Sequence, residues 1–436
     1  GASQTGFGRT GTVDWNTTPK TTTFTAVSGD GFFANTTGGA FTMNLPAGTA
    51  GAIVSVADYA GTWQTNNLTV SPNGTDKIGA VNADVILSTE GQSVTFIFVD
   101  STQGWLNIQD STSNERASFI EATGGTITCS GNCKIHTFTG PGTFTVSKIS
   151  TSCAPVNNLV SYMIVAGGGG GGGTGPSHTA GGGGAGGVRE TKSPATPYTA
   201  SPLDGFPTPG NRITLTATSF PITVGGGGAG AGEPDHGTQG STSTAFGISS
   251  AGGGGGGSIA SPGNDPGRDG QPGGSGGGGS SQTAGSGGTG NTPSVTPAQG
   301  TNGATGVDAP PDLRGGGGGG ATAAGSQGSN SPFAQGVGGA GATSCISGSP
   351  VVRGGGGGSG GSALAPVTTG GAGGAGGGGA GGSAPGVASR LGGDGTANTG
   401  GGGGGAAGGS PAVGEGACRT GGDGGSGVVI IRYKAR

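Results

Sequence analysis

Residues Gly167-Gly-Gly-Gly-Gly-Gly-Gly173 form an uninterrupted glycine run, and similar runs recur at 252–257, 315–320, 354–358 and 400–405. The chain contains 116 glycines, of which 20 lie in residues 1–160, so 96 lie after residue 160. A chain of this kind is either disordered or built from something other than helices and ordinary sheets.

Glycine runs can be ordered only through their backbone atoms. Glycine has no side chain to bury, so the hydrophobic effect cannot order it. In the polyproline II conformation there are three residues per turn and no internal hydrogen bonds, so every N–H and C=O points outward. Adjacent runs can bond to one another in several directions, and only glycine lets backbones come this close. We therefore predict a lattice of polyglycine II helices.

The lengths of the runs favour a lattice over a flexible linker. Most runs have six to eight residues, which is on the order of 20 Å each, whereas a linker needs no uniform length. Alanine and serine within runs are expected to mark the lattice edge, at Ala185, Ser275, Ala340 and Ser359. The predicted runs are 167–173, 181–187, 225–230, 252–257, 273–279, 285–290, 315–320, 336–341, 354–361, 370–382, 400–405 and 421–427.

Composition limits the classes of protein to which the chain can belong. Hydrophobic residues make up 29% and charged residues 9% of the 436 residues, and the formal net charge is −4. The low charge argues against ordinary disorder, and this charge balance offers no basic patch for nucleic acid. No apolar stretch approaches the roughly 18–20 residues that cross a membrane, so we expect no membrane insertion. Abundant Ser and Thr suit an extracellular or virion surface.

The residues before the glycine runs are predicted to form β-structure. Short stretches separated by turns such as Pro72-Asn-Gly74 predict a β-rich module over 1–112, and a second β-segment over 113–165 connects it to the glycine-rich domain, 166–436. No segment shows a sustained 3.6-residue period, so the fold class is all-β with almost no α-helix. The expected strands are Thr22–Val27, Gly31–Asn35, Phe41–Leu45, Ile53–Asp58, Leu68–Ser71, Val85–Leu87, Val94–Val99, Trp105–Gln109, Thr126–Thr128, Lys134–Phe138, Thr143–Val146, Val160–Val165, Arg212–Ala217, Pro221–Val224 and Gly427–Tyr433.

The last expected strand, Val428-Val-Ile-Ile-Arg-Tyr433, is predicted to pair with Tyr162-Met-Ile-Val165 and so to close the glycine-rich domain. His136, on a short strand between Ile135 and Phe138, is expected to be a satisfied inter-strand histidine rather than a metal ligand.

Ordered motifs in the first module carry a family resemblance. Val13-Asp-Trp15, Leu45-Pro-Ala-Gly48, Asp58-Tyr-Ala-Gly61 and Ser88-Thr-Glu-Gly-Gln92 follow one another along the chain. The segment resembles a β-module of phage tail fibres. This resemblance implies a trimeric shaft or spacer rather than a catalytic domain.

A second set of motifs extends the resemblance. It comprises Tyr162-Met-Ile-Val-Ala-Gly-Gly168, Phe220-Pro-Ile-Thr-Val-Gly-Gly226 and Gly424-Gly-Ser-Gly-Val-Val-Ile-Ile-Arg-Tyr433. Residues 124–436 resemble the glycine-rich domain of phage tail-fibre and adhesin proteins, which implies a polyglycine II core that displays variable loops for receptor binding. The chain departs from this family in its proline-rich loop 189–211 and in its cysteines.

Five cysteines are an odd number and favour an oxidising compartment. Cys129 and Cys133 bracket Ser-Gly-Asn, a good hairpin turn, so a cross-strand disulfide is sterically plausible. Zinc is the alternative for this close pair, although the other cysteines lie far away along the chain. Cys345 and Cys418 sit in separate loops beside glycine runs and could join those loops.

Candidates for catalysis and cofactor binding are few. Glu233-Pro-Asp-His236 is the densest acid and histidine cluster, and we expect a solvated turn there. Asn264-Asp-Pro-Gly-Arg-Asp269 resembles a calcium loop only loosely, and no Gly-Lys-Ser/Thr sequence follows a glycine run to bind phosphate. We therefore expect no enzyme activity, no metal and no cofactor.

Loops between the runs are the expected binding elements, because loops vary while a scaffold holds them. They contain most of the aromatic residues of the glycine-rich half, and aromatic and arginine side chains anchor recognition surfaces. The favoured loops are 189–211, 258–272, 291–314 and 321–335. The receptor-binding candidates within them are Tyr198, Phe206, Arg268, Asp269, Asp312, Arg314 and Phe333.

The sequence therefore predicts a virion tail-fibre adhesin that binds a host cell-surface glycan or outer-membrane protein, with a homotrimeric shaft. One alternative is a structural glycine-rich extracellular filament or surface protein without specific receptor binding. A glycan-cleaving enzyme is a further alternative, and it would need an acidic pair such as Glu233 and Asp235 in an aromatic groove.

Overall fold

The computed structural model describes residues 13–111, 119–150, 155–175, 178–232, 234–259, 265–310, 312–330, 333–362, 369–384, 390–409 and 419–435. The chain divides into two compact units, Gly1–Ala117 and Ser118–Arg436. From Ser118 on, the predicted connector therefore belongs to the same unit as the glycine runs. Strands dominate the described secondary structure, and its helices are 3₁₀ turns of three or four residues, so the all-β prediction is confirmed.

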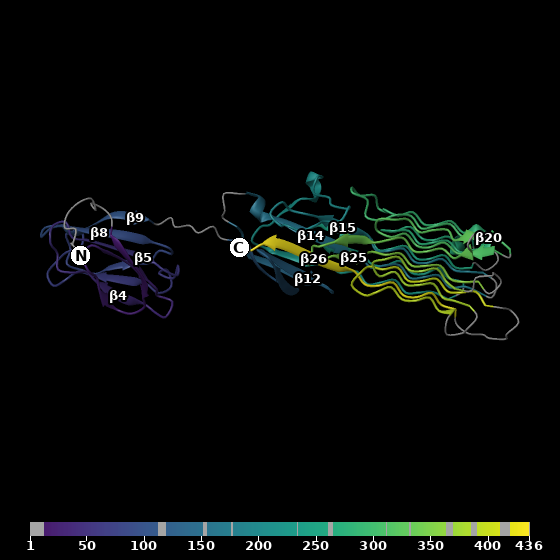
Figure 1. Ribbon diagram of the computed structural model, residues 1–436, viewed down its shortest axis with the longest axis horizontal. Coiled ribbons are helices and arrows are strands. Elements are labelled where there is room, and N and C mark those ends of the chain that lie inside the picture. Colours follow the sequence, from purple (N-terminus) through teal and green to yellow (C-terminus); the bar gives the residue numbers. More distant parts are fainter. Residues whose placement is uncertain are drawn as a thin grey trace, which may run out of the picture. The chain divides into compact units, whose positions relative to one another are not determined.

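Two sheets form the first unit (Figure 1). The five-stranded sheet has the order β1-β3-β5-β8-β9, and the four-stranded sheet has the order β2-β4-β6-β7. Alternating side chains of the two sheets form one core, in which Phe32, Val54 and Phe96 meet Met43 and Leu68. The strands are β1 (Asp14–Lys20), β2 (Phe24–Thr25), β3 (Asp30–Ala34), β4 (Phe41–Asn44), β5 (Ile53–Asp58), β6 (Leu68–Ser71), β7 (Val85–Leu87), β8 (Ser93–Asp100) and β9 (Gly104–Ser111).

The second unit contains β10 (Glu121–Thr123), β11 (Thr126–Ser130), β12 (Cys133–Phe138), β13 (Gly142–Lys148), β14 (Leu159–Val165), β15 (Val188–Thr191), β16 (Ile213–Thr214), β17 (Ser219–Ile222), β18 (Ser243–Ala245), β19 (Ile248–Ser250), β20 (Val307–Ala309), β21 (Asp312–Arg314), β22 (Ser329–Asn330), β23 (Phe333–Ala334), β24 (Ala342–Ser344), β25 (Val351–Arg353) and β26 (Val428–Lys434). Its 3₁₀ turns are η1 (Pro155–Asn158), η2 (Pro209–Asn211), η3 (Asp265–Arg268) and η4 (Gln282–Ala284).

A six-stranded sheet anchors the glycine runs. Its order is β11-β12-β26-β14-β15, and β16 pairs with β14. The predicted closure by the last strand is confirmed, since β26 pairs with β14 and places Tyr162 opposite Ile431. β26 also pairs with β12, so the C-terminal strand occupies the middle of the sheet.

Both faces of this sheet are buried. Ile431 and Tyr433 of β26 face a core that includes Phe144 of the three-stranded sheet β10-β13-β17. Ile430, their neighbour on the opposite face, packs with Met163 and Val188. Hydrophobic residues on both faces explain why β14 and β26 are continuous apolar runs in the sequence.

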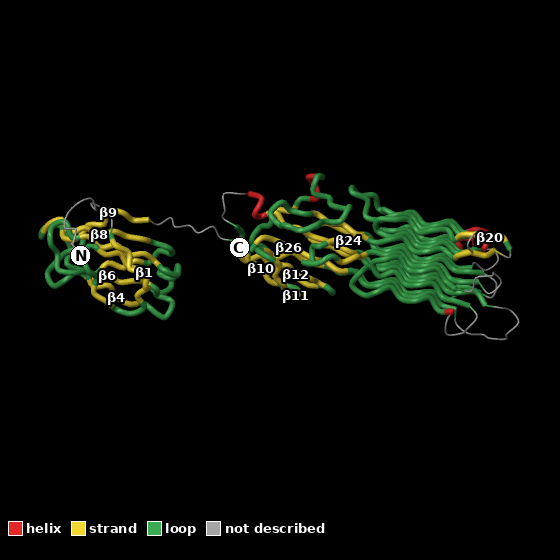
Figure 2. The backbone as a smooth tube through the Cα atoms, in the orientation of Figure 1, coloured by secondary structure: helices red, strands yellow, loops and turns green. Residues whose placement is uncertain are grey.

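The glycine runs extend from this sheet as a set of aligned, extended segments (Figure 2). Residues 180–187 form the central run. The N–H groups of Gly181, Gly182 and Gly183 donate to three different neighbours, and the next three N–H groups repeat the same order. Carbonyls of the central run accept bonds from three further runs. The six neighbours are 166–173, 253–258, 274–280, 315–320, 354–361 and 400–407.

This arrangement is the predicted polyglycine lattice. The change of partner at every residue, with a repeat after three, is the rotation of a polyproline II-type helix. The central run and its six neighbours, hereafter the inner runs, are buried along their whole length. At Gly182, a Cβ atom would lie 2.1 Å from the carbonyl oxygen of Gly357, so contact between these backbones requires glycine there.

Outer runs surround the inner ones and follow a different pattern. In 370–375, for example, Ala372 and Ala375 are exposed, whereas the glycine that precedes each of them, Gly371 and Gly374, is buried. Side chains thus point to solvent at every third residue. The outer runs are 225–231, 237–242, 270–273, 285–290, 300–306, 325–328, 336–341, 370–375, 378–384, 390–395 and 421–427.

The prediction that alanine and serine mark the lattice edge is wrong at three positions. Ala340 is exposed, but Ala185, Ser275 and Ser359 are fully buried in inner runs. The hydroxyl of Ser275 donates to Gly320 O at 3.0 Å, and that of Ser359 donates to Gly336 O at 3.2 Å. Small side chains are therefore accommodated inside the lattice at these three positions, and both serine hydroxyls bond to a carbonyl there.

Candidate functional site

The inner runs of the lattice join two groups of connecting segments. One group lies at the six-stranded sheet, and the other lies at the opposite end of the lattice, here called the distal end, where β20 is labelled (Figure 1). Runs 300–306 and 315–320 are joined at the distal end by the hairpin β20–β21. The hairpin β24–β25 contributes Ala342 to the core at the sheet and therefore belongs to the other group.

Three segments of the distal end are tied together by hydrogen bonds. Arg268, at the end of η3, donates from Nη1 to Thr283 Oγ1 in η4. The backbone N–H of Thr283 in turn donates to Asp308 Oδ2 of β20 at 2.9 Å. Asp269 accepts from the backbone N–H of Ser286 at 2.6 Å. Two predicted site residues, Arg268 and Asp269, therefore fix neighbouring loops to one another.

Arg314 and Phe333 form a second contact of the distal hairpins. The Arg314 guanidinium carbon lies 5.7 Å from the centre of the Phe333 ring, a cation–π distance. Arg314 is only 6% exposed, and its Nη1 donates to Gly328 O at 3.3 Å. Asp312, half-buried, pairs with Ala309 across the β20–β21 hairpin. Phe333 remains half-buried and offers part of its surface to solvent.

Tyr198 and Phe206 lie with the sheet rather than with the other predicted residues. Tyr198 packs beside the core of β14 and β26, and the guanidinium of Arg432 in β26 lies 5.2 Å from its ring centre. Burial raises the pKa of the Tyr198 hydroxyl, and the nearby Glu190 carboxylate raises it further. Phe206 carries the exposed Arg212 guanidinium 4.6 Å above its ring.

The proline-rich loop 189–211 is therefore part of the sheet framework. It contains β15, which the sequence analysis did not predict, and the Glu190 side chain is almost completely buried. Glu190 accepts from the backbone N–H of Ser201 at 2.9 Å and from the Ser344 hydroxyl at 2.6 Å. These bonds connect the loop to β24.

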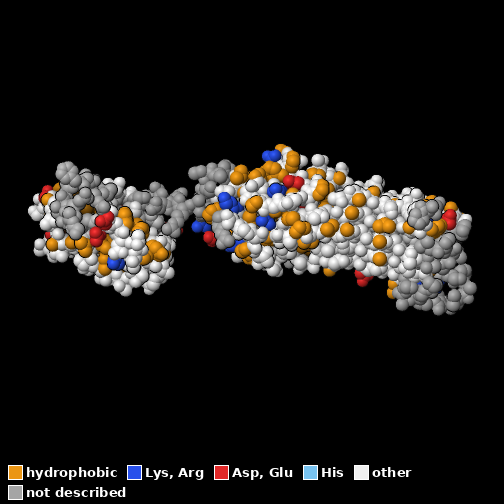
Figure 3. All heavy atoms as spheres, in the orientation of Figure 1, with side chains coloured by type: hydrophobic (Ala, Val, Ile, Leu, Met, Phe, Trp, Pro, Cys, Tyr) orange, Lys and Arg blue, Asp and Glu red, His pale blue; other side chains and the backbone are white. Residues whose placement is uncertain are grey.

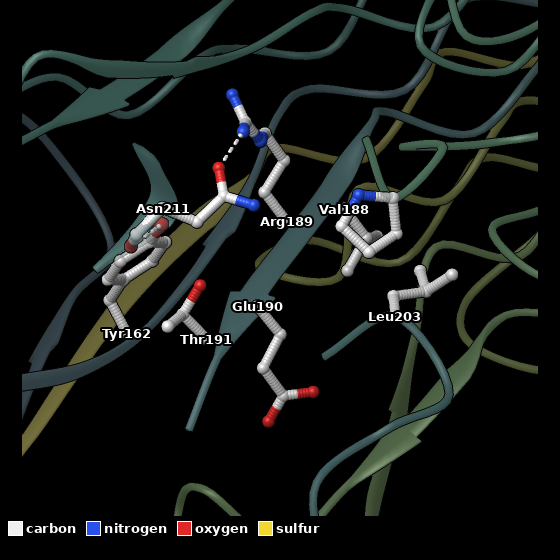
Figure 4. A pocket seen from close by; sticks show the side chains of 8 residues that line it. Tyr162, Val188, Arg189, Glu190, Thr191, Leu203 and Asn211 are labelled. Atoms are coloured by element: carbon white, nitrogen blue, oxygen red, sulfur yellow. Dashed lines mark hydrogen bonds between the residues drawn. The ribbon is translucent and has the colours of Figure 1, made fainter. Parts of the chain in front are cut away.

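A small cavity lies beside Glu190 (Figure 4). Tyr162, Arg189 and Asn211 line it, and Arg189 Nη2 donates to Asn211 Oδ1 at 2.7 Å. The cavity has roughly the space of one water molecule. It is too small to hold a sugar ring.

The acidic cluster gives little support to an active site. Glu233 lies outside the described residues, and Asp235 donates its backbone N–H to Gly232 O at 3.0 Å in a turn. The His236 ring contacts the amide nitrogen of Gln271 at 2.8 Å. Within the described ranges, no group of three His, Cys, Asp or Glu side chains is placed to hold a metal ion.

The structure does not contain the Cys129–Cys133 disulfide that the hairpin spacing made sterically plausible. Cys129 pairs with Lys134, and Cys133 pairs with Ser130, so the two thiols occupy positions one residue out of register and point to opposite faces of the sheet. Cys129 is exposed and Cys133 is buried, and both are free. Cys345 is also a free thiol, and Cys418 lies outside the described residues.

The charged side chains of the second unit gather mainly over the sheets on the face seen in Figure 3, and few lie over the lattice. Among the described residues, no helix has the length and apolar character needed to span a membrane.

The structure also contains lattice runs that the sequence analysis missed, namely 237–242, 270–273, 300–306, 325–328 and 390–395. Several of them have glycine only at every third position, as at Gly300, Gly303 and Gly306. A search for glycine at a spacing of three, rather than for continuous glycine, would find such outer runs.

A comparison with protein families matches residues 139–434 to a model described as a glycine-rich domain. The matched segment includes every lattice run and both β14 and β26. No curated protein matches the sequence.

Proposed function

Because the chain belongs to the glycine-rich domain family, with the lattice as its scaffold, we propose that it is a phage tail-fibre adhesin. In this proposal, loops at the distal end of the lattice bind a glycan or an outer-membrane protein on the host surface. The protein is then located on the virion, exposed to the extracellular medium, and it binds its receptor without cleaving it.

One observation supports the proposal. The described runs end side by side at the distal end of the lattice, and backbone hydrogen bonds hold these runs to one another. A rigid scaffold with variable loops is the usual architecture of a recognition surface. Phe333 is half-buried, and the buried guanidinium of Arg314 lies 5.7 Å from its ring centre, so this surface gains an aromatic group that is held in place.

The N-terminal unit suits a shaft that associates with copies of itself. Trp15, Ile86 and Ile108 are large apolar side chains that are 44%, 60% and 52% exposed. The Trp15 and Phe33 rings contact each other with centres 4.9 Å apart and planes tilted by 34°. The three exposed side chains lie on three different strands, β1, β7 and β9, and the state that we propose from the resemblance to tail-fibre modules is a homotrimer. Sedimentation analysis of the N-terminal unit tests this part, and a monomer at micromolar concentration would contradict it.

Binding to whole cells tests the adhesin proposal. Labelled protein is incubated with a panel of bacterial strains that includes hosts of phages carrying this sequence, and bound protein is measured by flow cytometry. Replacement of 329–334 by a Gly-Ser linker should reduce binding, whereas Phe206→Ala, at the sheet, should leave binding unchanged.

Two outcomes would contradict the proposal. Absence of binding to every susceptible strain would exclude a receptor-binding role for the isolated chain. End-to-end polymers with no affinity for cells, seen by electron microscopy, would favour a structural filament instead.

A further inference from the structure

The lattice has one open position. In hexagonal packing, each run around the central one has a single outer position directly outside it. The outer run 370–375 occupies that position outside the inner run 354–361, to which it is hydrogen-bonded. Among the described residues, only the inner run 253–258 has no run directly outside it. The position beside this run, between the outer runs 237–242 and 270–273, is hereafter called the open corner.

The inner run 253–258 directs an unused hydrogen-bond donor at the open corner. The N–H groups of Gly254 and Gly256 donate to neighbouring runs at 2.9 Å. The N–H group of Gly255, between them, has no acceptor in the described structure. Because each residue turns the helix by a third of a turn, this N–H points away from the neighbours that are bonded and toward the open corner. Gly255 is buried, and a buried N–H without a partner is rare in folded proteins.

Groups in phase with Gly255 show which acceptor is missing. Ser258, three residues further along, donates its N–H to Gly267 O of η3 at 2.8 Å, so the corner is filled at the distal end. Gly252, three residues earlier, again has no acceptor in the described part of the chain. The open length therefore includes the levels of Gly252 and Gly255, which is two turns or roughly 19 Å.

The two flanking runs offer carbonyl groups to the same position. A Cβ atom on Gly255 would lie 1.6 Å from Gly237 O, which places this carbonyl beside the corner. Gly240 O is in phase with it, and no backbone N–H of the described residues donates to either carbonyl. On the other side, Pro272 O accepts from the side chain of Gln239. The open corner thus combines N–H donors from one run with carbonyl acceptors from two others.

Three side chains cover the open corner in place of a run. Gln239 reaches across it to Pro272 O, and the side-chain amide of Gln271 contacts the His236 ring at 2.8 Å. Gln271 Oε1 lies 3.2 Å from the Cβ position of Gly255. Gln239 is exposed, and Gln271 and His236 are half-buried. These side chains replace a run incompletely, because the Gly255 N–H remains without an acceptor.

We propose that the open corner binds an extended, glycine-rich segment of a partner protein, which adopts the polyproline II conformation and completes the lattice. Backbone hydrogen bonds hold the segment, as they hold a peptide that adds a strand to the edge of a β-sheet. The run that fills the corner on the opposite side, 370–375, reads Gly-Gly-Ala-Gly-Gly-Ala and exposes its alanines. The expected segment therefore has glycine at two of every three positions. This inference does not depend on the receptor that the distal loops bind.

Titration with a synthetic peptide tests the proposal. An unlabelled peptide of four Gly-Gly-Ala repeats is added to millimolar concentration to the ¹⁵N-labelled full chain, and the amide signals are followed by NMR. The signals of Gly252 and Gly255 should shift with saturation. A control peptide with sarcosine in place of glycine lacks the N–H donors and should bind about tenfold more weakly or less. Absence of shifts at these two residues, or equal binding of both peptides, would overturn the proposal.

Matched variants separate the open corner from the rest of the lattice surface. Gln239→Ala frees Pro272 O and should strengthen peptide binding by about threefold or more. Gln271→Trp fills the corner with a large side chain and should weaken binding by about tenfold, whereas Ala372→Trp, at the opposite corner, should change it less than about twofold. Equal effects of the two tryptophan variants would contradict the proposal. If Gln271→Trp does not fold, Gln239→Ala decides, and unchanged binding by that variant would contradict it as well.

Hydrogen exchange in the free protein tests whether the corner is open. The amide of Gly255 should exchange faster than those of Gly254 and Gly256, and saturating peptide should slow it to their rates. Exchange of Gly255 that is already as slow as that of its neighbours would show a filled corner and reject the proposal. A Gly255 signal that shifts when the protein alone is diluted would identify a second copy of the chain as the occupant, which would also reject it.

Discussion

Individual glycines of the lattice differ in how much room they leave for a side chain. At Gly183, in the central run, a Cβ atom would lie 2.2 Å from the carbonyl oxygen of Gly169. At Gly226, in an outer run, a Cβ atom would meet nothing within 4 Å. The same substitution to alanine is therefore expected to be costly at Gly183 and nearly without effect at Gly226.

Gly183→Ala is expected to lower the free energy of unfolding by about 2 kcal/mol or more, because backbone on both sides must move to make room. Gly226→Ala is the matched control and should change the free energy of unfolding by less than about 0.5 kcal/mol. Urea unfolding followed by circular dichroism measures both. Equal losses in the two variants would show that backbone contact does not set the requirement for glycine.

His136 makes the stability of the second unit depend on pH. Its Nδ1–H donates to Gly124 O at 2.7 Å, so Nε2 is the acceptor for the Tyr433 hydroxyl at 3.1 Å. Burial lowers the pKa of His136 below its ordinary value of 6.5. Below pH 6.5 the unfolded chain therefore binds a proton that the folded chain does not, and stability falls as the pH decreases.

This dependence can be measured as the difference in free energy of unfolding between pH 7.5 and pH 5.5. We expect the wild-type protein to be less stable at pH 5.5, and His136→Gln to show a smaller difference. An unchanged difference in the variant would assign the pH dependence to other groups.

Among the elements, β26 joins two cores. Ile430 and Ile431 are adjacent and fully buried on opposite faces of the sheet. Replacement of either by alanine should cost about 2–5 kcal/mol, since each leaves a cavity in a different core. Ile127→Ala is the control, because this residue of β11 belongs to the same sheet but is 45% exposed. Thermal unfolding of the three variants tests this expectation. Little or no loss of stability in Ile430→Ala and Ile431→Ala would contradict it.

Elements with strong apolar patterns could be predicted from the sequence. Ile53–Asp58 and the pairing of β14 with β26 follow from continuous or alternating hydrophobic residues. β1 was missed because its sequence is polar, with threonine and proline at most positions near its end. β15 was missed because its burial comes from contacts distant in sequence, above all those of Glu190 with Ser344.

The candidate site was only partly predictable for the same reason. Aromatic and arginine content correctly singles out side chains that make specific contacts, such as Arg314 and Phe333. The residue types of a loop do not show at which end of a run that loop lies. Tyr198 and Phe206 were expected with the other candidates, but they lie at the sheet.

At the scale of the whole second unit, rigidity comes from lateral hydrogen bonds rather than from a hydrophobic core. Amide hydrogens of 180–187 should exchange with solvent far more slowly than those of a synthetic peptide with the same sequence, because each is bonded to a neighbouring run. Hydrogen exchange followed by NMR measures this protection. Exchange at the peptide's rate would mean that the distal loops have no rigid support.

The rotation of bonding partners every three residues also limits how such a chain can change its length. Removal of one residue from the middle of an inner run would turn every later N–H group by a third of a turn, toward a neighbour that already has its bonds. Removal or addition of three residues would return each group to its original direction. Within the runs, insertions and deletions should therefore be tolerated in multiples of three, much as codons preserve a reading frame, whereas the connecting segments are free of this restriction.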